Sequence, residues 1–223
     1  MAAGKRPSLI FDYDGTIHDT LRIYEPAVEQ AFQWLRRQGY AVPEASGKKI
    51  ASWLGMNTRD MWNSFLPDLP GEIKGQAASL VGEAMKQAVQ EGRAAWYPGM
   101  PEILGQLKEK GYSMAILSNC QASYAEIHWD AFRMERWFDF FFDCESFQSA
   151  PKSEIILHVT DRFPPPYVVI GDRYSDLEAA KSSGSPFIGC VYGFGSPEEL
   201  GGAQRLAQTP EDRILFARLY EKL

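Results

Sequence analysis

The sequence has few of the features that define disulfide-bonded, zinc-binding or membrane-spanning proteins. Its three cysteines are widely spaced and form no Cys-x-x-Cys pair: Cys120, Cys144 and Cys190. This spacing argues against a disulfide framework or a structural zinc site, and the three separated histidines add no support for zinc. No stretch approaches the roughly 18 consecutive apolar residues of a transmembrane helix, and residues 1–8 lack the apolar core of a signal peptide. We therefore expect a cytoplasmic protein with reduced thiols and no membrane partner.

An excess of positive charge is also missing. The 23 lysines and arginines are outnumbered by 29 aspartates and glutamates, which gives a formal net charge of -6 without any long basic run. Nucleic acid is a disfavoured partner, because binding it without sequence specificity requires clustered cations that displace counterions. Hydrophobic residues make up 45% of the chain and charged residues 23%. This balance predicts a globular protein, and 223 residues suffice for one domain carrying a smaller insertion.

Between residues 20 and 95 the sequence shows helical periodicity and no convincing strand. In the first helical stretch, apolar residues recur at every fourth position before Gly39: Ile23, Ala27, Ala31 and Leu35. A second amphipathic stretch covers about residues 47–65, and a third follows the break at residues 67–71. Three consecutive helices predict a separate helical domain over residues 20–95.

The flanking parts of the chain alternate short apolar runs with helical patterns. The expected strands lie at residues 9–11, 112–117, 138–142, 167–170 and 187–191. Helices are expected between them, and Thr209-Pro210 is typical of the start of a final helix. This alternation predicts an α/β fold, a doubly wound Rossmann-like parallel sheet formed by residues 1–19 and 96–223, with residues 20–95 inserted as an all-helical cap.

Polar residues follow three of the predicted strands or precede a helix in this α/β part. They comprise four carboxylates, two hydroxyls and one ammonium group: Asp12, Asp14, Thr16, Ser118, Lys152, Asp172 and Asp176. In an open parallel sheet the carboxyl ends of the strands form the ligand-binding edge, so these groups should meet there. Four neighbouring carboxylates repel one another unless a cation lies between them, and Mg2+ is the hard cation that prefers such ligands.

The same groups fit phosphoryl transfer, which requires a nucleophile, neutralised phosphoryl oxygens and a proton for the leaving group. One aspartate could attack phosphorus while its neighbour two residues later protonates the departing alkoxide. Lys152 and the hydroxyl of Ser118 could then hold the phosphoryl oxygens.

Four segments in the expected order resemble the signatures of the haloacid dehalogenase-like hydrolase superfamily. They are Phe11-Asp12-Tyr13-Asp14-Gly15-Thr16, then Leu117-Ser118-Asn119, then Lys152, and finally Gly171-Asp172-Arg173-Tyr174-Ser175-Asp176. The helical insertion lies where this family has a helical cap, and Tyr97-Pro98-Gly99 resembles the return from it. The stretch Cys190-Val191-Tyr192-Gly193-Phe194-Gly195 is similar to the late part of the phosphoglycolate phosphatase-like branch, which is related to β-phosphoglucomutase.

The resemblance implies a role for each motif residue. Asp12 would be the nucleophile that forms an aspartyl-phosphate and also binds magnesium, and Asp14 would be the general acid and base, with its backbone carbonyl on the metal. Asp172 would bind the metal directly and Asp176 through water or by orienting Lys152. Lys152 would act with them at the transferring phosphoryl group.

The resemblance also assigns a substrate-binding group: Thr16, Ser118, Asn119, Arg173 and, in the cap, Arg59. Two positions depart from the common pattern. The proline next to Lys152 precedes it instead of following it, and Arg173 stands where a small residue is frequent. An arginine there could bind a substrate anion or point to solvent. The favoured substrate is a small phosphorylated metabolite such as phosphoglycolate.

Other interpretations remain open at this stage. Asp12 to Gly15 could be only a polar turn, Lys152 could be a solvated lysine at a helix start, and Trp53 and Trp62 could be core residues or line a pocket. A phosphomutase would share the same core residues, a dehalogenase would not need Asp14, and a non-catalytic binding member of the fold would keep the architecture alone.

Overall fold

The computed structural model describes residues 6–45, 47–56, 58–210 and 212. The chain divides into two compact units, one formed by residues up to His18 and from Trp96 onward, the other by Asp19–Ala95. No helix within the described ranges is long and apolar enough to cross a membrane. Each unit is described separately below.

The first unit is built on a six-stranded sheet in which every neighbouring pair of strands is parallel, in the order β3-β2-β1-β4-β5-β6. The strands are β1 (Ser8–Phe11), β2 (Met114–Ser118), β3 (Phe140–Asp143), β4 (Tyr167–Gly171), β5 (Phe187–Cys190) and β6 (Arg205–Ala207). The central strands β1, β2 and β4 are buried throughout. Their apolar runs form strands because both faces of a parallel sheet are covered by helices. The doubly wound α/β fold expected from the sequence is confirmed.

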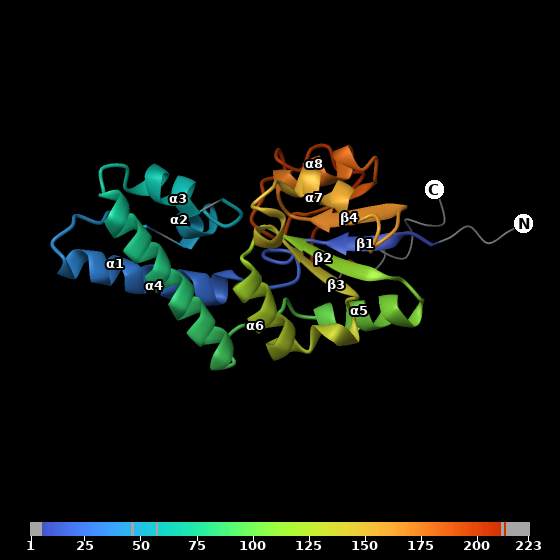
Figure 1. Ribbon diagram of the computed structural model, residues 1–223, viewed down its shortest axis with the longest axis horizontal. Helices are drawn as coiled ribbons and strands as arrows, with labels where there is room; N and C mark the ends of the chain where they lie inside the picture. The colour runs from blue at the N-terminus through green and yellow to red at the C-terminus, as the bar shows by residue number, and fades with distance from the viewer. Residues whose placement is uncertain (1–5, 46, 57, 211, 213–223) are drawn as a thin grey trace, which may run out of the picture. The chain divides into compact units, whose positions relative to one another are not determined.

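Alternate residues of the strands pack into two separate cores. Phe11 of β1 belongs to the core that includes α5 (Met100–Glu109), and its neighbour Ile10 belongs to the core that includes α7 (Lys152–His158) and α8 (Tyr174–Ser182). Figure 1 shows α7 and α8 on one face of the sheet and α5 and α6 (Ala122–Phe132) on the other. This alternation follows from the two-residue period of side chains along a strand.

Several boundaries differ from the sequence expectation. Strand β6 was not predicted, because Arg205–Ala207 has only three residues, two of them exposed, and no apolar run. Helix α7, one of the helices expected between strands, begins at Lys152 and ends at His158. The helix expected after Thr209-Pro210 lies outside the described residues.

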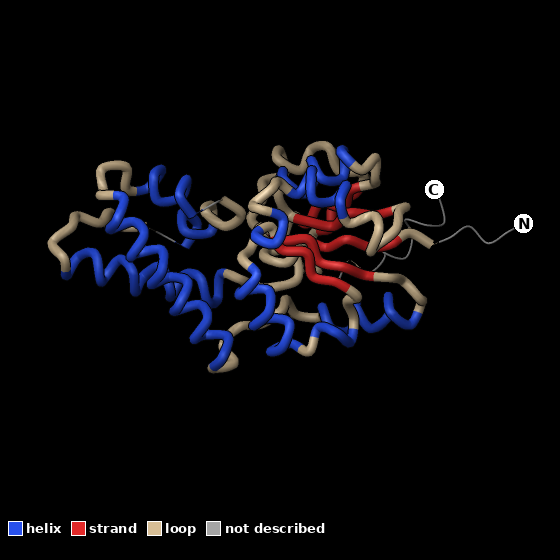
Figure 2. Tube along the Cα trace, in the orientation of Figure 1, coloured by secondary structure: helices blue, strands red, loops and turns tan. Residues whose placement is uncertain are grey.

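The second unit contains helices only, as Figure 2 shows by the absence of strand colour among its described residues. They are α1 (Leu21–Arg37), α2 (Gly47–Ala51), α3 (Thr58–Phe65) and α4 (Gly71–Gln90). The prediction of one helix over residues 47–65 is wrong, because Gly55 between α2 and α3 has a φ of 85° that no helix interior accepts. Trp53 and Trp62 are buried and pack edge-to-face on Phe32, so the core interpretation of these tryptophans holds.

The chain passes between the units at two adjacent points. His18 and Trp96 form an isolated β-bridge, and the backbone N–H of Tyr97 donates to the carbonyl of Ile17 at 2.9 Å. Immediately beyond, Asp19 N donates to the carbonyl of Ala95 at 3.0 Å. The outgoing and returning segments are therefore paired by backbone hydrogen bonds where the helical unit begins and ends.

Candidate active site

Three central strands bring the predicted site residues to one edge of the sheet. Phe11 is in register with Ile116 of β2 and Ile170 of β4. Asp12, which follows Phe11, donates its backbone N–H to the carbonyl of Ile170 at 2.7 Å. Asp12 therefore lies beside the carboxyl ends of β2 and β4, where Ser118 and Asp172 are found.

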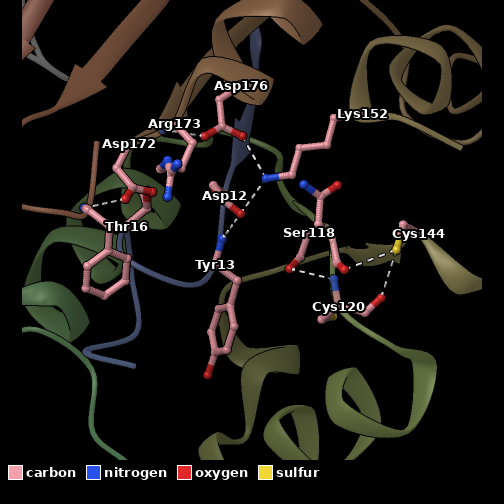
Figure 3. A network of polar contacts seen from close by, with 12 residues as sticks. Asp12, Tyr13, Thr16, Ser118, Cys120, Cys144, Lys152, Asp172, Arg173 and Asp176 are labelled. Atoms are coloured by element: carbon pink, nitrogen blue, oxygen red, sulfur yellow. Dashed lines mark hydrogen bonds and ion pairs between the residues drawn. The ribbon is translucent and has the colours of Figure 1, made fainter. Parts of the chain in front are cut away.

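Three carboxylates meet at this edge. One oxygen from each of Asp12, Asp172 and Asp176 lies within 4.8 Å of the others, and all three side chains are buried. Figure 3 shows them arranged around the loop that follows β1. Such a cluster of buried oxygen ligands fits a hard divalent cation.

Lys152 supplies the positive charge of the cluster. Its Nζ lies 2.6 Å from Asp12 Oδ1 and 2.7 Å from Asp176 Oδ1, and the residue is 3% exposed. The alternative that Lys152 is a solvated lysine at a helix start is therefore wrong, although Lys152 does begin α7 after Pro151. Burial alone would lower the pKa of its ammonium group, but Asp12 and Asp176 together raise this pKa above its usual value, so the lysine remains charged.

One ammonium group does not balance three carboxylates. Burial and then the neighbouring Asp176 raise the pKa of Asp12 well above its usual value, although Lys152 opposes this change. Burial and then Asp176 also raise the pKa of Asp172 to about 7. Both shifts record the electrostatic penalty of ionising carboxyl groups in one buried place. A bound divalent cation would remove that penalty, so the residues present fit a magnesium site.

The surroundings of Asp172 leave little freedom for its side chain. Its Oδ1 accepts a hydrogen bond from Thr16 Oγ1 at 3.1 Å, and its Oδ2 accepts one from the backbone N–H of Phe194 at 2.7 Å. Gly15 has a φ of 85°, and a Cβ at this position would clash with Asp172 Oδ2 and the Phe194 ring. Glycine is required here for its backbone conformation and for the close approach.

Asp176 connects the cluster to the start of α8. Its Oδ1 faces Lys152, and its Oδ2 accepts the backbone N–H of Arg173 at 3.0 Å. The carboxylate therefore caps the helix and faces Lys152 at once. Arg173 is half-buried, and its Nε donates to Glu199 Oε1 at 2.9 Å. This guanidinium therefore already forms an ion pair within the protein.

Ser118 ends β2 and Asn119 follows it, and the two side chains have different environments. Ser118 is buried, and its Oγ accepts the backbone N–H of Cys120 at 3.3 Å. Asn119 is exposed, and its carbonyl accepts the thiol of Cys144 at 3.1 Å. Figure 3 places Ser118 on the side of the Asp12 loop from which Lys152 approaches.

The Asp14 carboxylate contacts two residues that the sequence motifs did not indicate. Its Oδ1 accepts the hydroxyl of Tyr124 at 2.7 Å and lies 3.2 Å from Nδ1 of His18. Tyr124 is on α6, 110 residues further along the chain. A local motif contains no signal for such a contact, and only the presence of a tyrosine in the helix after Ser118 could have suggested it.

Arg59 belongs to the helical unit and is described there alone. Its side chain is 83% exposed, and its Nε lies 3.6 Å from an oxygen of Asp60. The structure therefore shows an accessible cation on α3.

The chain is similar to known proteins over most of its length. A family model described as haloacid dehalogenase-like hydrolase matches residues 9–190, a span that runs from the second residue of β1 through β5 and includes every predicted site residue. Phosphoglycolate phosphatase from Escherichia coli strain K12 is 22% identical over 218 residues, covering 87% of this chain and 84% of its own length. The phosphoglycolate phosphatase of Pseudomonas putida is 25% identical over 202 residues, covering 86% of this chain and 72% of its own.

Solved structures show the same fold. A haloacid dehalogenase-like family protein from Streptococcus pneumoniae superposes with a TM-score of 0.75 at 19% identity, covering 95% of this chain and 98% of its own. A predicted phosphoglycolate phosphatase from Haemophilus somnus gives a TM-score of 0.79 at 19% identity, with coverage of 95% and 98%. At these identities the likeness concerns the fold.

Proposed function

Because this chain belongs to the haloacid dehalogenase-like hydrolase family, we propose that it is a magnesium-dependent phosphatase that hydrolyses a small phosphomonoester through an aspartyl-phosphate on Asp12. The observation that carries the proposal is the buried group of Asp12, Asp172 and Asp176 with Lys152 inserted between two of the carboxylates. A nucleophile, a cation site and a fixed ammonium group at one strand edge are the requirements of phosphoryl transfer.

The proposed reaction has two steps. In the first, an oxygen of Asp12 attacks phosphorus, the bond from phosphorus to the ester oxygen breaks, and the departing oxygen takes a proton from Asp14. In the second, Asp14 accepts a proton from water while this water attacks the phosphorus of the aspartyl-phosphate, and the bond from phosphorus to the Asp12 oxygen breaks. The products are an alcohol, inorganic phosphate and the restored Asp12 carboxylate.

Magnesium would be held by Asp12, Asp172 and Asp176, with the backbone carbonyl of Asp14. When bound, it supplies positive charge that neutralises the phosphoryl oxygens and offsets the repulsion among the carboxylates. Lys152 would hold the transferring phosphoryl group, and its charge favours the ionised form of Asp12 against the burial and neighbouring carboxylates that raise this pKa. This division of roles is supported by the raised pKa values of Asp12 and Asp172.

The remaining residues would bind substrate. Ser118 and Thr16 are buried near the strand edge, whereas Asn119 is exposed and Arg173 is half-buried. Residues 20–95 would serve as a cap that excludes water during the first step, with Arg59 as a specificity residue. A two-carbon phosphate such as phosphoglycolate is the favoured substrate, supported by the names of the relatives from Escherichia coli and Pseudomonas putida.

The test is phosphate release from a panel of phosphomonoesters, with and without Mg2+, by the wild type and Asp12→Asn. We expect turnover that depends on magnesium and is lost in Asp12→Asn. The matched control is Asp161→Asn, the same change at an exposed aspartate in the connection that precedes β4. Transfer of phosphate to a second sugar hydroxyl without release would instead identify a phosphomutase, and magnesium binding with no turnover of any ester would identify a binding protein. Either result would refute the proposal.

A further inference from the structure

The carboxylate of Asp14 lies against a polar and aromatic cluster that includes His18 and Tyr124. Two groups meet at Oδ1 of Asp14, the Tyr124 hydroxyl at 2.7 Å and His18 Nδ1 at 3.2 Å. The same hydroxyl lies 3.3 Å from His18 Nδ1. The Tyr124 hydroxyl donates to this oxygen, and His18 donates to it in the tautomer that carries its proton on Nδ1.

A second layer of side chains fixes these donors. Tyr13, located between the two aspartates of the first motif, stacks on His18 with ring centroids 5.2 Å apart at an angle of 10°. Figure 3 shows the Tyr13 ring pointing away from Asp12 and Lys152, toward the opposite side of the loop. The rings of His18 and His128 are in edge contact at 4.7 Å. His18 therefore contacts two buried rings and has little freedom to turn.

The hydrogen bonds of this second layer run from donor to acceptor in the order Trp96, Tyr13 and His128. The indole N–H of Trp96 can only donate, and it lies 3.2 Å from the Tyr13 oxygen. The Tyr13 hydroxyl then donates to His128 Nδ1 at 2.7 Å. His128 is fully buried, and burial, with His18 nearby, lowers its pKa to about 3, so it remains neutral and can accept this proton. Each ring is thus held by a directed hydrogen bond.

Helix α6 presents this cluster to the loop with helical spacing. Tyr124, His128 and Phe132 follow one another at intervals of four residues, so they lie along one face of the helix. Tyr124 and His128 are in ring contact at 4.1 Å, and His128 stacks on Phe132 at 5.7 Å. The hydroxyl of Tyr124 is therefore delivered to Asp14 by a helix whose other aromatic groups are packed.

We infer that Tyr124 and His18 are positioning residues that hold the Asp14 carboxyl in the orientation needed to exchange a proton with the ester oxygen and then with water. This inference rests on the proposed function. A general acid contributes about 10²–10⁴ in rate only when it lies within hydrogen-bonding distance of the group it protonates. Two donors on one oxygen fix the plane of the carboxyl group, and the aromatic layer keeps both donors in place.

The test compares two classes of ester in Tyr124→Phe, which removes one hydroxyl and keeps the ring. An alkyl phosphate such as phosphoglycolate has a leaving group that needs a proton, whereas nitrophenolate leaves p-nitrophenyl phosphate without one. The ratio kcat/KM reports the steps through formation of the aspartyl-phosphate. We expect kcat/KM to fall about tenfold for the alkyl ester, the effect of one hydrogen bond to a charged group, and to stay within about twofold for the aryl ester.

Two further variants serve as positive and negative controls for this comparison. Asp14→Asn should show the same selectivity for the aryl ester in a stronger form. Tyr112→Phe should leave both esters unchanged, because Tyr112 is a buried tyrosine at the opposite end of β2 from Ser118. Thermal melting of each variant shows whether folding is affected.

The outcomes separate the inference from the proposed function. If Tyr124→Phe lowers kcat/KM equally for both esters, or for neither while Asp14→Asn is selective, Tyr124 does not position the acid and the inference fails alone. If the wild type hydrolyses no ester of the substrate panel, the proposed function fails and the inference with it.

Discussion

Replacing Lys152 by methionine tests the electrostatics of the site most directly. Methionine has a similar length and removes only the charge and the hydrogen bonds. The ammonium group lies 2.6 Å from Asp12 and 2.7 Å from Asp176, and all three side chains are buried. Lys152→Met therefore leaves two buried carboxylates without their shared cation.

Removing one partner of a buried ion pair typically destabilises a protein by about 3–5 kcal/mol, because the remaining charge is buried without compensation. The cost should depend on pH. The folded-state pKa of Asp12 lies above its unfolded value, so at low pH the folded protein holds this carboxyl in its neutral form and needs the ammonium less. As pH rises through that raised pKa the carboxylate ionises, and the cost of Lys152→Met should grow. Added Mg2+ should recover part of the loss.

Unfolding in urea at pH 5 and pH 8, with a chelator and then with Mg2+, measures these effects. Hydrogen exchange in β1 and β4 confines the measurement to the α/β unit. Lys108→Met is the matched control, because Lys108 forms a 3.0 Å pair with Asp139 that is exposed on both sides, and such pairs contribute about 0–1 kcal/mol. Equal losses for the two lysines, or a loss at position 152 that does not change with pH, would refute the reasoning.

Three further results are expected. Magnesium affinity, measured by calorimetry, should weaken by about tenfold per pH unit below the pKa of about 7 for Asp172, because the ion competes with a proton for this carboxyl, and affinity independent of pH would contradict its role as a ligand. Gly39→Ala should cost about 1–2 kcal/mol in unfolding experiments, since its φ is 86° and its Cβ would meet open space, whereas Gly15→Ala should cost more and also weaken magnesium binding, because its φ is 85° and its Cβ would clash with Asp172. Arg59→Ala should change the ranking of esters in the substrate panel without changing the melting temperature, since this side chain is 83% exposed, and an unchanged ranking would remove Arg59 from the substrate site.

Much of the fold could be predicted because its central strands are uniform apolar runs. Ser8–Phe11 and Tyr167–Gly171 are buried along their whole length, and such strands need no partner information to be recognised. Strand β6 shows the opposite case, because Arg205–Ala207 pairs with β5 through its backbone while two of its side chains are exposed. The break in the second helical stretch depended on the backbone angle of Gly55, and an apolar pattern does not record such an angle.

The site, like the fold, has a part that could be predicted from the sequence and a part that could not. Residues that directly follow a strand, such as Asp12 and Asp172, could be placed because a parallel sheet brings strand ends together. The partners of Asp14 could not be placed. The histidines at 18 and 128 are separated in the sequence, yet their rings lie 4.7 Å apart because α6 crosses the loop after β1. Contacts between a helix face and a distant loop depend on packing, and no local spacing encodes them.

The paired segments at the base of the helical unit have an evolutionary consequence. Asp19 and Ala95 are joined by a backbone hydrogen bond of 3.0 Å, so an insertion of more than 70 residues begins and ends at almost the same point of the chain. Exchange of the whole insertion for another, or its reduction to a short turn, would leave the paired ends of the α/β unit in place. With the helical unit acting as the proposed cap, such an arrangement would let substrate preference diverge by replacement of a module, while the α/β unit keeps its site.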